Sequence, residues 1–193
     1  VHEYPRLELS VNIKNTEVVF VGYGITAPEY GWDDYKGVDV RNKVLIMLSG
    51  EPSRPDKADP SKADSSFFKG DIRTFYDTME FKNALATKLG AAGVLHITDP
   101  EKSPNYSLFT TFALFEGFKL SPRGPAVKAL AFTGLVKIGS AKRLFAAADR
   151  DLDKLKELAQ QREFKPISTN VHADITMTSK LRRIVSRNVV ARI

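Results

Sequence analysis

The chain has 193 residues, of which 42% are hydrophobic and 27% are charged, so its composition is that of a globular protein large enough to bury a core. It contains no cysteine, which excludes disulfides, thiolate zinc sites and cysteine nucleophiles. The net charge is +6, and basic residues are concentrated near the C-terminus. No aromatic residue follows Lys180 to stack on bases, so we interpret these cations as a solvated strand face and expect no nucleic-acid partner.

The N-terminus reads VHEYPRLELS, which contains neither the basic nor the apolar segment of a signal peptide. We interpret the chain as a fragment of a longer protein. No apolar run approaches the roughly 18 residues that a membrane-spanning helix needs, so we predict no membrane span.

Strand and turn patterns alternate over the first fifty residues. Apolar and polar residues alternate over 7–13, which predicts a half-buried strand that ends in a turn at 14–15. A nearly all-apolar second strand is predicted over 17–21, followed by a Gly-rich loop over 22–37. A further short apolar strand is predicted over 44–48.

Two later segments lack a clear pattern of regular structure. Three prolines and small polar residues over 51–66 predict an exposed loop within one domain. The stretch 100–125 carries Phe109, Phe112, Phe115 and Phe118, three residues apart. We favour the interpretation that these rings fill a core or a packing seam, because such stripes are usually core. The alternative is an exposed aromatic strip that contacts a partner.

A helix is predicted to begin at the D-x-x-E pattern of Asp77 and Glu80 and to end at Gly90. Its core-facing stripe is predicted to consist of Phe81, Leu85 and Leu89. The apolar run VLHIT follows and predicts a buried strand. Strand, helix and strand at this spacing predict one parallel crossover unit.

The last third of the chain predicts one more strand over 135–138 and a helical segment over 140–164. Ser140 is predicted to cap a helix with Leu144 and Phe145 inward, and Asp151 to cap another. The inward side of this second helix is predicted to comprise Leu152, Leu155, Leu158 and Ala159. Alternation over 171–177 and a final strand over 184–193 complete a single domain over 1–193.

The segment from Gly22 to Ala27 matches G-x-G-x-x-A, the dinucleotide-binding fingerprint. That fingerprint requires a helix to start at the turn, whereas Pro28, Gly31 and DDYKG follow here. We therefore interpret Gly22 and Gly24 as structural residues that permit a tight turn with positive φ.

Metal or catalytic chemistry has few candidate residues. The three histidines, His2, His96 and His172, lie far apart in sequence, and we expect His96 to be a core residue with a hydrogen bond and His172 to face solvent. Asp33, Asp34 and Asp39 do not follow the order of a calcium loop. We interpret them as caps of turns, and we expect no catalytic residue, metal or cofactor in this chain.

Four large semi-polar rings lie in the first loop. Amphipathic rings of this kind suit an interface with a wet rim. The alternative is that Trp32 folds back and fixes the loop. The candidate residues for an interface or for contact with substrate are Tyr23, Tyr30, Trp32 and Tyr35.

Four blocks of the sequence resemble the protease-associated (PA) domain of secreted zinc-dependent aminopeptidases of the aminopeptidase Y type. The most specific block is FVGYGITAPEYGWDDYKGVDVRNKVLIML. Less specific are FKNALATKLGAAGVLHIT, AKRLFAAADRDLDKLKELAQQREFKPIS and the final SRNVVARI. The stretch 100–123 resembles nothing in the family.

The resemblance implies a mixed α/β, swivelling β/β/α domain, with an open barrel or split sheet flanked by a few helices. It implies a non-catalytic, extracytoplasmic module whose partners are a catalytic domain in cis and a peptide or protein substrate. The zinc ligands of the parent would follow residue 193, and no family ligand maps onto this chain. The alternative function is a stand-alone protein- or peptide-binding module without peptidase activity.

Overall fold

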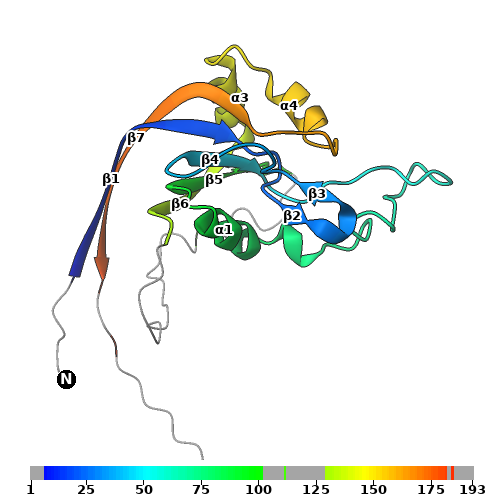
Figure 1. Ribbon diagram of the computed structural model, residues 1–193, viewed down its shortest axis with the longest axis horizontal. Coiled ribbons are helices and arrows are strands. Elements are labelled where there is room, and N and C mark those ends of the chain that lie inside the picture. Colours follow the sequence, from blue (N-terminus) through cyan, green and yellow to red (C-terminus); the bar gives the residue numbers. More distant parts are fainter. Residues whose placement is uncertain (1–6, 102–110, 112–128, 182–183, 185–193) are drawn as a thin grey trace, which may run out of the picture.

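The computed structural model of the chain describes residues 7–101, 111, 129–181 and 184. Among these residues, five strands form one sheet in the order β6-β5-β4-β1-β7. The strands are β1 (Leu7–Phe20), β4 (Val44–Leu48), β5 (Gly93–Thr98), β6 (Phe132–Lys137) and β7 (Ile167–Leu181). Strands β1, β4, β5 and β6 run parallel, and β7 pairs antiparallel with β1. The sheet is strongly curled (Figure 1), and the prediction of a mixed α/β fold is confirmed at this coarse level.

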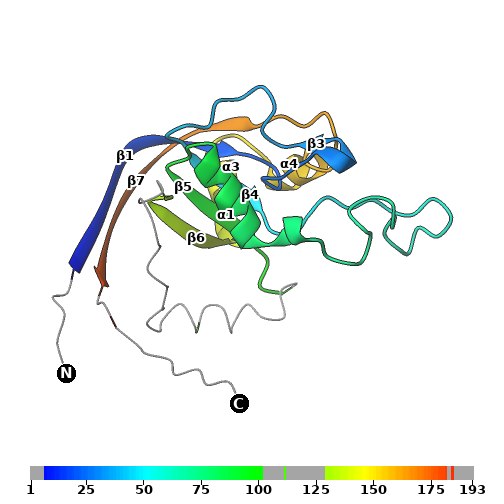
Figure 2. The same cartoon turned by 60° about the horizontal axis from the view of Figure 1, so that its bottom comes forward.

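Helices cover both faces of the sheet. Helix α1 (Met79–Lys88) lies against one face, whereas α3 (Ile138–Ala146) and α4 (Leu152–Leu158) lie against the other (Figures 1 and 2). The predicted crossover is confirmed, because α1 connects the parallel strands β4 and β5. All five residues of β4 are buried, as expected for a strand covered on both faces.

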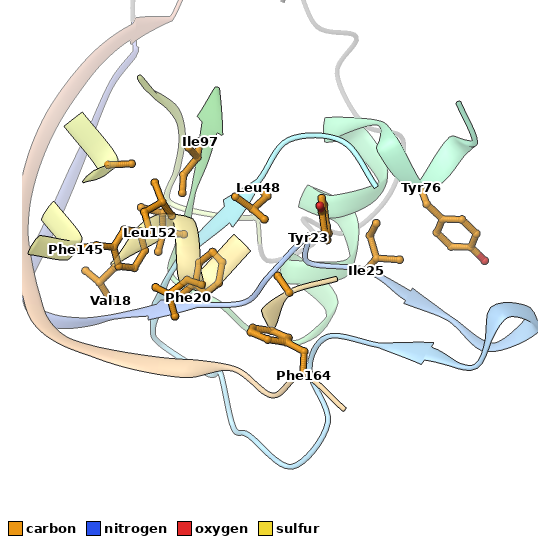
Figure 3. Packing of buried hydrophobic residues seen from close by; sticks show 14 of the residues in the cluster. Val18, Phe20, Tyr23, Ile25, Leu48, Tyr76, Ile97, Phe145, Leu152 and Phe164 are labelled. Carbon is orange, nitrogen blue, oxygen red and sulfur yellow. The ribbon is translucent and has the colours of Figure 1, made fainter. Parts of the chain in front are cut away.

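The alternating residues of the strands build two apolar cores. The core under α3 and α4 contains Val18, Phe20, Phe145 and Leu152 (Figure 3). The ring of Phe145 meets that of Phe20 edge-on, with centroids 5.5 Å apart. The core under α1 contains residues of opposite parity from the same strands, together with Ala86.

The predicted turn at 14–15 is wrong, because β1 is one strand of 14 residues. Its pairing with β7 shifts register between Ile13 and Thr16, where Asn15 has a φ of 47°. The Asn15 amide donates to Asp174 Oδ1 at 2.6 Å. Residues 14–15 therefore form a β-bulge in β1, because Asp174 on β7 supplies the hydrogen-bond acceptor that a local turn would otherwise provide.

The predicted helix exists, but two of its details differ. Thr78 is the N-cap, and its side chain accepts from the Phe81 amide at 3.3 Å, so the proposed D-x-x-E cap is wrong. The most buried residues of α1 are Lys82 and Ala86, while the predicted apolar stripe is only half-buried. Gly90 has a φ of 80° directly after the helix, which confirms it as the stop.

The last helices begin partly where predicted. Strand β6 ends at Lys137 and α3 begins at Ile138, so Ser140 lies inside the helix and is not its cap. Asp151 is the N-cap of α4 and accepts from the Asp153 amide at 2.8 Å, as predicted. Leu158 is 44% exposed, contrary to the prediction, because it lies at the end of a helix of seven residues.

The remaining predictions concern the segments 51–66, 109–118 and 184–193. The first contains neither a helix nor a strand longer than one bridge, and most of it is exposed, as predicted. The Phe-rich segment 109–118 lies outside the described residues, apart from residue 111. Residues 185–193 also lie outside them, and Ile184 is not part of a strand. No helix in the described part of the chain is long and apolar enough to cross a membrane.

Candidate functional site

The strongest concentration of unusual residues lies where β1 and β4 end, at the turn that follows β1. Gly22 and Gly24 have φ values of 56° and 69°, which confirms the predicted left-handed turn. A Cβ atom on Gly22 would lie 2.9 Å from the ring of Phe164, and one on Gly24 would lie 2.8 Å from Met47 Sδ. Both positions therefore require glycine for conformation and for space.

The rings of the first loop lie mostly inside the domain. Tyr23 and Tyr35 are each 7% exposed and Trp32 is 2% exposed, while Tyr30 is half-buried. The Trp32 indole donates to Asp34 Oδ1 at 2.9 Å, and Tyr30 stacks on Phe68 at 4.4 Å. This burial favours the alternative that Trp32 fixes the loop. Contact of the loop with a partner stays a prediction, and Tyr30 is the ring of these four with the most accessible surface.

Asp34 is the buried acid of this loop. Its two carboxylate oxygens accept from the Ile25 amide at 3.0 Å and from the Trp32 indole. Burial raises the pKa of Asp34 to about 7, although these hydrogen bonds and the charge of Lys82 act in the opposite direction. The carboxylate thus links Ile25 to Trp32 across the loop, and these hydrogen bonds explain how the core accommodates a polar side chain.

The other two acids act as turn caps, as predicted. Asp33 accepts from the Tyr35 amide at 2.9 Å. Asp39 accepts from the Arg41 amide at 3.0 Å and pairs with its guanidinium. Among the described residues, no group of three His, Asp or Glu side chains is arranged to hold a metal ion.

Lys82 is a buried lysine that the sequence patterns did not predict. Its side chain is 1% exposed, and Nζ donates to the Leu48 carbonyl at 3.0 Å and to the Gly50 carbonyl. Burial lowers the pKa of Lys82 to about 8, against the opposing attraction of Asp77 and two other acids. The ammonium group therefore fastens α1 to the end of β4. No pattern distinguishes it from a solvent-exposed lysine, because its partners are main-chain carbonyls.

His96 is buried beside this cluster, as predicted for a core histidine. Its Nε2 lies 2.9 Å from Asn83 Oδ1, an acceptor, so Nε2 is the nitrogen that carries the proton. No described residue hydrogen-bonds to its Nδ1. Burial and the nearby Lys82 charge lower the pKa of His96 to about 4. His172 is exposed on β7, as predicted, and His2 lies outside the described residues.

A surface hollow of about 800 Å³ lies at the ends of β5 and β6. Basic and acidic side chains line it together, and several of them pair with one another. Lys142 lies 2.6 Å from Asp153, Lys156 lies 3.8 Å from the same carboxylate, and Arg143 donates to Ser140 Oγ at 3.1 Å. The lining of the hollow thus carries both positive and negative charges, so it indicates neither an anionic nor a cationic ligand.

The buried polar residues Asp34, Lys82 and Tyr23 connect separate elements of the fold. Asp34 and Lys82 are held by main-chain groups, and Tyr23 accepts a hydrogen bond from Gln160 beyond α4. These bonds hold the loop, α1 and the chain after α4 against the end of the sheet.

Comparison with protein-family models, with curated proteins and with solved structures finds no match for this chain.

Proposed function

We propose that this chain is a PA-type, non-catalytic domain of an exported zinc aminopeptidase. In this proposal it packs beside the catalytic domain of its parent and shapes the access of peptide substrates. The zinc and its ligands would belong to the parent's catalytic domain and not to this chain. The resemblance of the block Phe20–Leu48 supports the proposal, because that block supplies the clamped turn and the fully buried strand β4.

The observation that carries the proposal is the pairing of β1 with β7. Leu7 lies opposite Leu181 in an antiparallel register, so the chain enters and leaves the domain side by side (Figure 1). This geometry permits the module to be joined to a second domain at one narrow tip. Buried groups such as Asp34 and Lys82 are engaged in holding the fold together, which suits a supporting role.

A candidate surface for contact with substrate lies beside the half-buried Tyr30. Phe75 and Ile72 are 59% and 70% exposed, and the Phe75 ring packs on Tyr76 at 4.1 Å. The ring of Tyr76 in turn meets that of Tyr30, with centroids 6.4 Å apart. An exposed aromatic ring supported by a buried aromatic cluster is suited to bind apolar side chains of a peptide.

The proposal is tested on the chain alone and in its parent. We expect the isolated chain to retain no stoichiometric zinc after dialysis and to hydrolyse no aminoacyl amide above a buffer control. In the parent, Phe75→Ala should alter KM for long peptides and leave turnover of a minimal chromogenic amide unchanged. Leu158→Ala, at an exposed position on α4, is the matched control.

Two results would contradict the proposed function. Turnover by the isolated chain would make it an enzyme in its own right, and one tightly bound zinc per chain would place a metal site in this domain that the proposal assigns to the parent's catalytic domain. A parent that contains no metallopeptidase domain would favour the stand-alone binding module instead, and a peptide that binds the isolated chain through Phe75 would support that second function.

A further inference from the structure

The outer part of the β1–β7 pair is a two-stranded ribbon that projects from the sheet (Figure 1). Strand β1 pairs with β4 only over Val18–Phe20, whereas its pairing with β7 continues to Leu7. The ribbon therefore lacks a third strand over most of its length, as far as the described residues extend. An isolated pair of strands is marginally stable in water and needs a further surface to pack on.

The two faces of this ribbon differ in chemistry. Val11 lies opposite Met177 and Ile13 lies opposite Ile175, so these aliphatic residues share one face. The opposite face carries polar pairs such as Asn12 with Thr176. A ribbon that remained in water on both sides would not require an aliphatic face.

The aliphatic face loses its cover toward the tip of the ribbon. Ile13 is 9% exposed and packs with the core under α3, together with Val11 and Ile175. Met177 is 41% exposed and Leu181 is 46% exposed. Among the described residues, the same stripe thus begins as core and ends as exposed surface, which suits contact with a second body.

We propose that the exposed part of the aliphatic ribbon face, defined by Met177 and Leu181, is the surface on which the neighbouring domain in cis packs. This inference rests on the proposed function, which supplies that domain. The chain continues from the tip on both strands, toward residues 6 and 182, so a domain joined there is held beside the face. Such a tether gives an effective concentration on the order of millimolar, far above that of a second free copy. An apolar partner surface suits this face best, because the side chains of Met177 and Leu181 offer no charge or hydrogen-bond donor.

The test compares two aspartate substitutions at adjacent positions on β7. Met177→Asp places a charge on the aliphatic face, and Thr178→Asp places the same charge on the polar face. In the full parent polypeptide, Met177→Asp should lower Tm by roughly 3 °C or more and accelerate trypsin cleavage at Lys180 about tenfold. Thr178→Asp should change neither. In the isolated chain of 193 residues, both variants should unfold within about 1 °C of the unmodified chain.

Each alternative gives a different result. An equal loss of Tm in the isolated chain would mean that the face is covered from within the domain. An isolated chain that forms a dimer by light scattering, and that Met177→Asp converts to a monomer, would assign the face to a second copy. Equal behaviour of both variants in the parent would also overturn the proposal. If Met177→Asp does not fold, Met177→Gln replaces it as a neutral polar variant of similar size.

The ribbon test and the function test can fail separately. Unfolding and proteolysis of the parent report docking whether or not the parent hydrolyses peptides. A parent without peptidase activity in which Met177→Asp still exposes Lys180 would refute the proposed function and leave the docking surface in place.

Discussion

Two buried groups of this domain should make opposite contributions to stability between about pH 5 and 6.5. Asp34 has its pKa raised to about 7 by burial, and His96 has its pKa lowered to about 4 by burial and by Lys82. In this pH range the folded chain keeps Asp34 largely protonated and His96 neutral. The unfolded chain does the reverse, because its Asp is ionised and its His is largely protonated.

The signs follow from proton counts. At Asp34 the folded state binds more protons than the unfolded state, so the free energy of unfolding falls as pH rises toward 7. At His96 the unfolded state binds more protons, so stability rises from pH 4 toward about 6.5. Each slope is at most about 1.4 kcal/mol per pH unit, or roughly 2 kcal/mol across the window. In the unmodified chain the two slopes nearly cancel.

Single substitutions should separate the two slopes. In Asp34→Asn, urea unfolding should show stability rising by roughly 1–2 kcal/mol over this window, and in His96→Gln it should show a fall of similar size. Glutamine preserves the hydrogen-bond donor toward Asn83. A constant loss of stability is expected in both variants, so only the change with pH is diagnostic. Two variants with the same flat profile as the unmodified chain would refute the assignment of these charge states.

Other perturbations test the packing at the end of the sheet. Gly22→Ala should cost more than Gly37→Ala in thermal unfolding, because both have positive φ but only Gly22 has a ring within contact distance; equal costs would contradict this. Lys82→Met should lower stability by about 1–3 kcal/mol, because it removes the donor that binds the Leu48 and Gly50 carbonyls. It should also remove the rise in stability expected from pH 8 toward about 10.5. Phe145→Ala should cost about 3–5 kcal/mol in urea unfolding, against less than about 1 kcal/mol for Leu158→Ala.

Patterns of local sequence predicted much of this fold. The all-apolar run of β4 and the cap of α4 at Asp151 depend on neighbours in sequence, and both predictions hold. The unbroken strand β1 was missed, because Asn15 obtains its partner from Asp174, 159 positions away. Turn propensities reflect only interactions between neighbours in sequence, and here the pairing of β1 with β7 outweighs the preference of residues 14–15 for a turn.

The candidate site was predicted in part for a related reason. The positive φ values of Gly22 and Gly24 follow from glycine chemistry and were predictable. The sequence left two interpretations of Trp32 open, namely contact with a partner and packing that fixes the loop. Only the structure shows that its hydrogen-bond partner, Asp34, is buried with it. The burial of Lys82 depends on carbonyl groups that every sequence possesses, so no residue pattern predicts it.

The ribbon face and the Phe75 surface should act independently in the parent. The ribbon leaves one end of the sheet, whereas the segment 51–78 projects from the opposite end (Figure 2). A contact at one surface therefore has no shared neighbour through which to alter the other, and effects on separate surfaces usually add. In the double variant Met177→Asp with Phe75→Ala, the loss of Tm should equal the sum of the losses of the two single variants, and the change in the logarithm of KM should equal the sum of their two changes. A coupling free energy above about 0.5 kcal/mol, calculated from either measurement, would show that docking of the ribbon and access of the peptide are linked and would contradict the independence of the two surfaces.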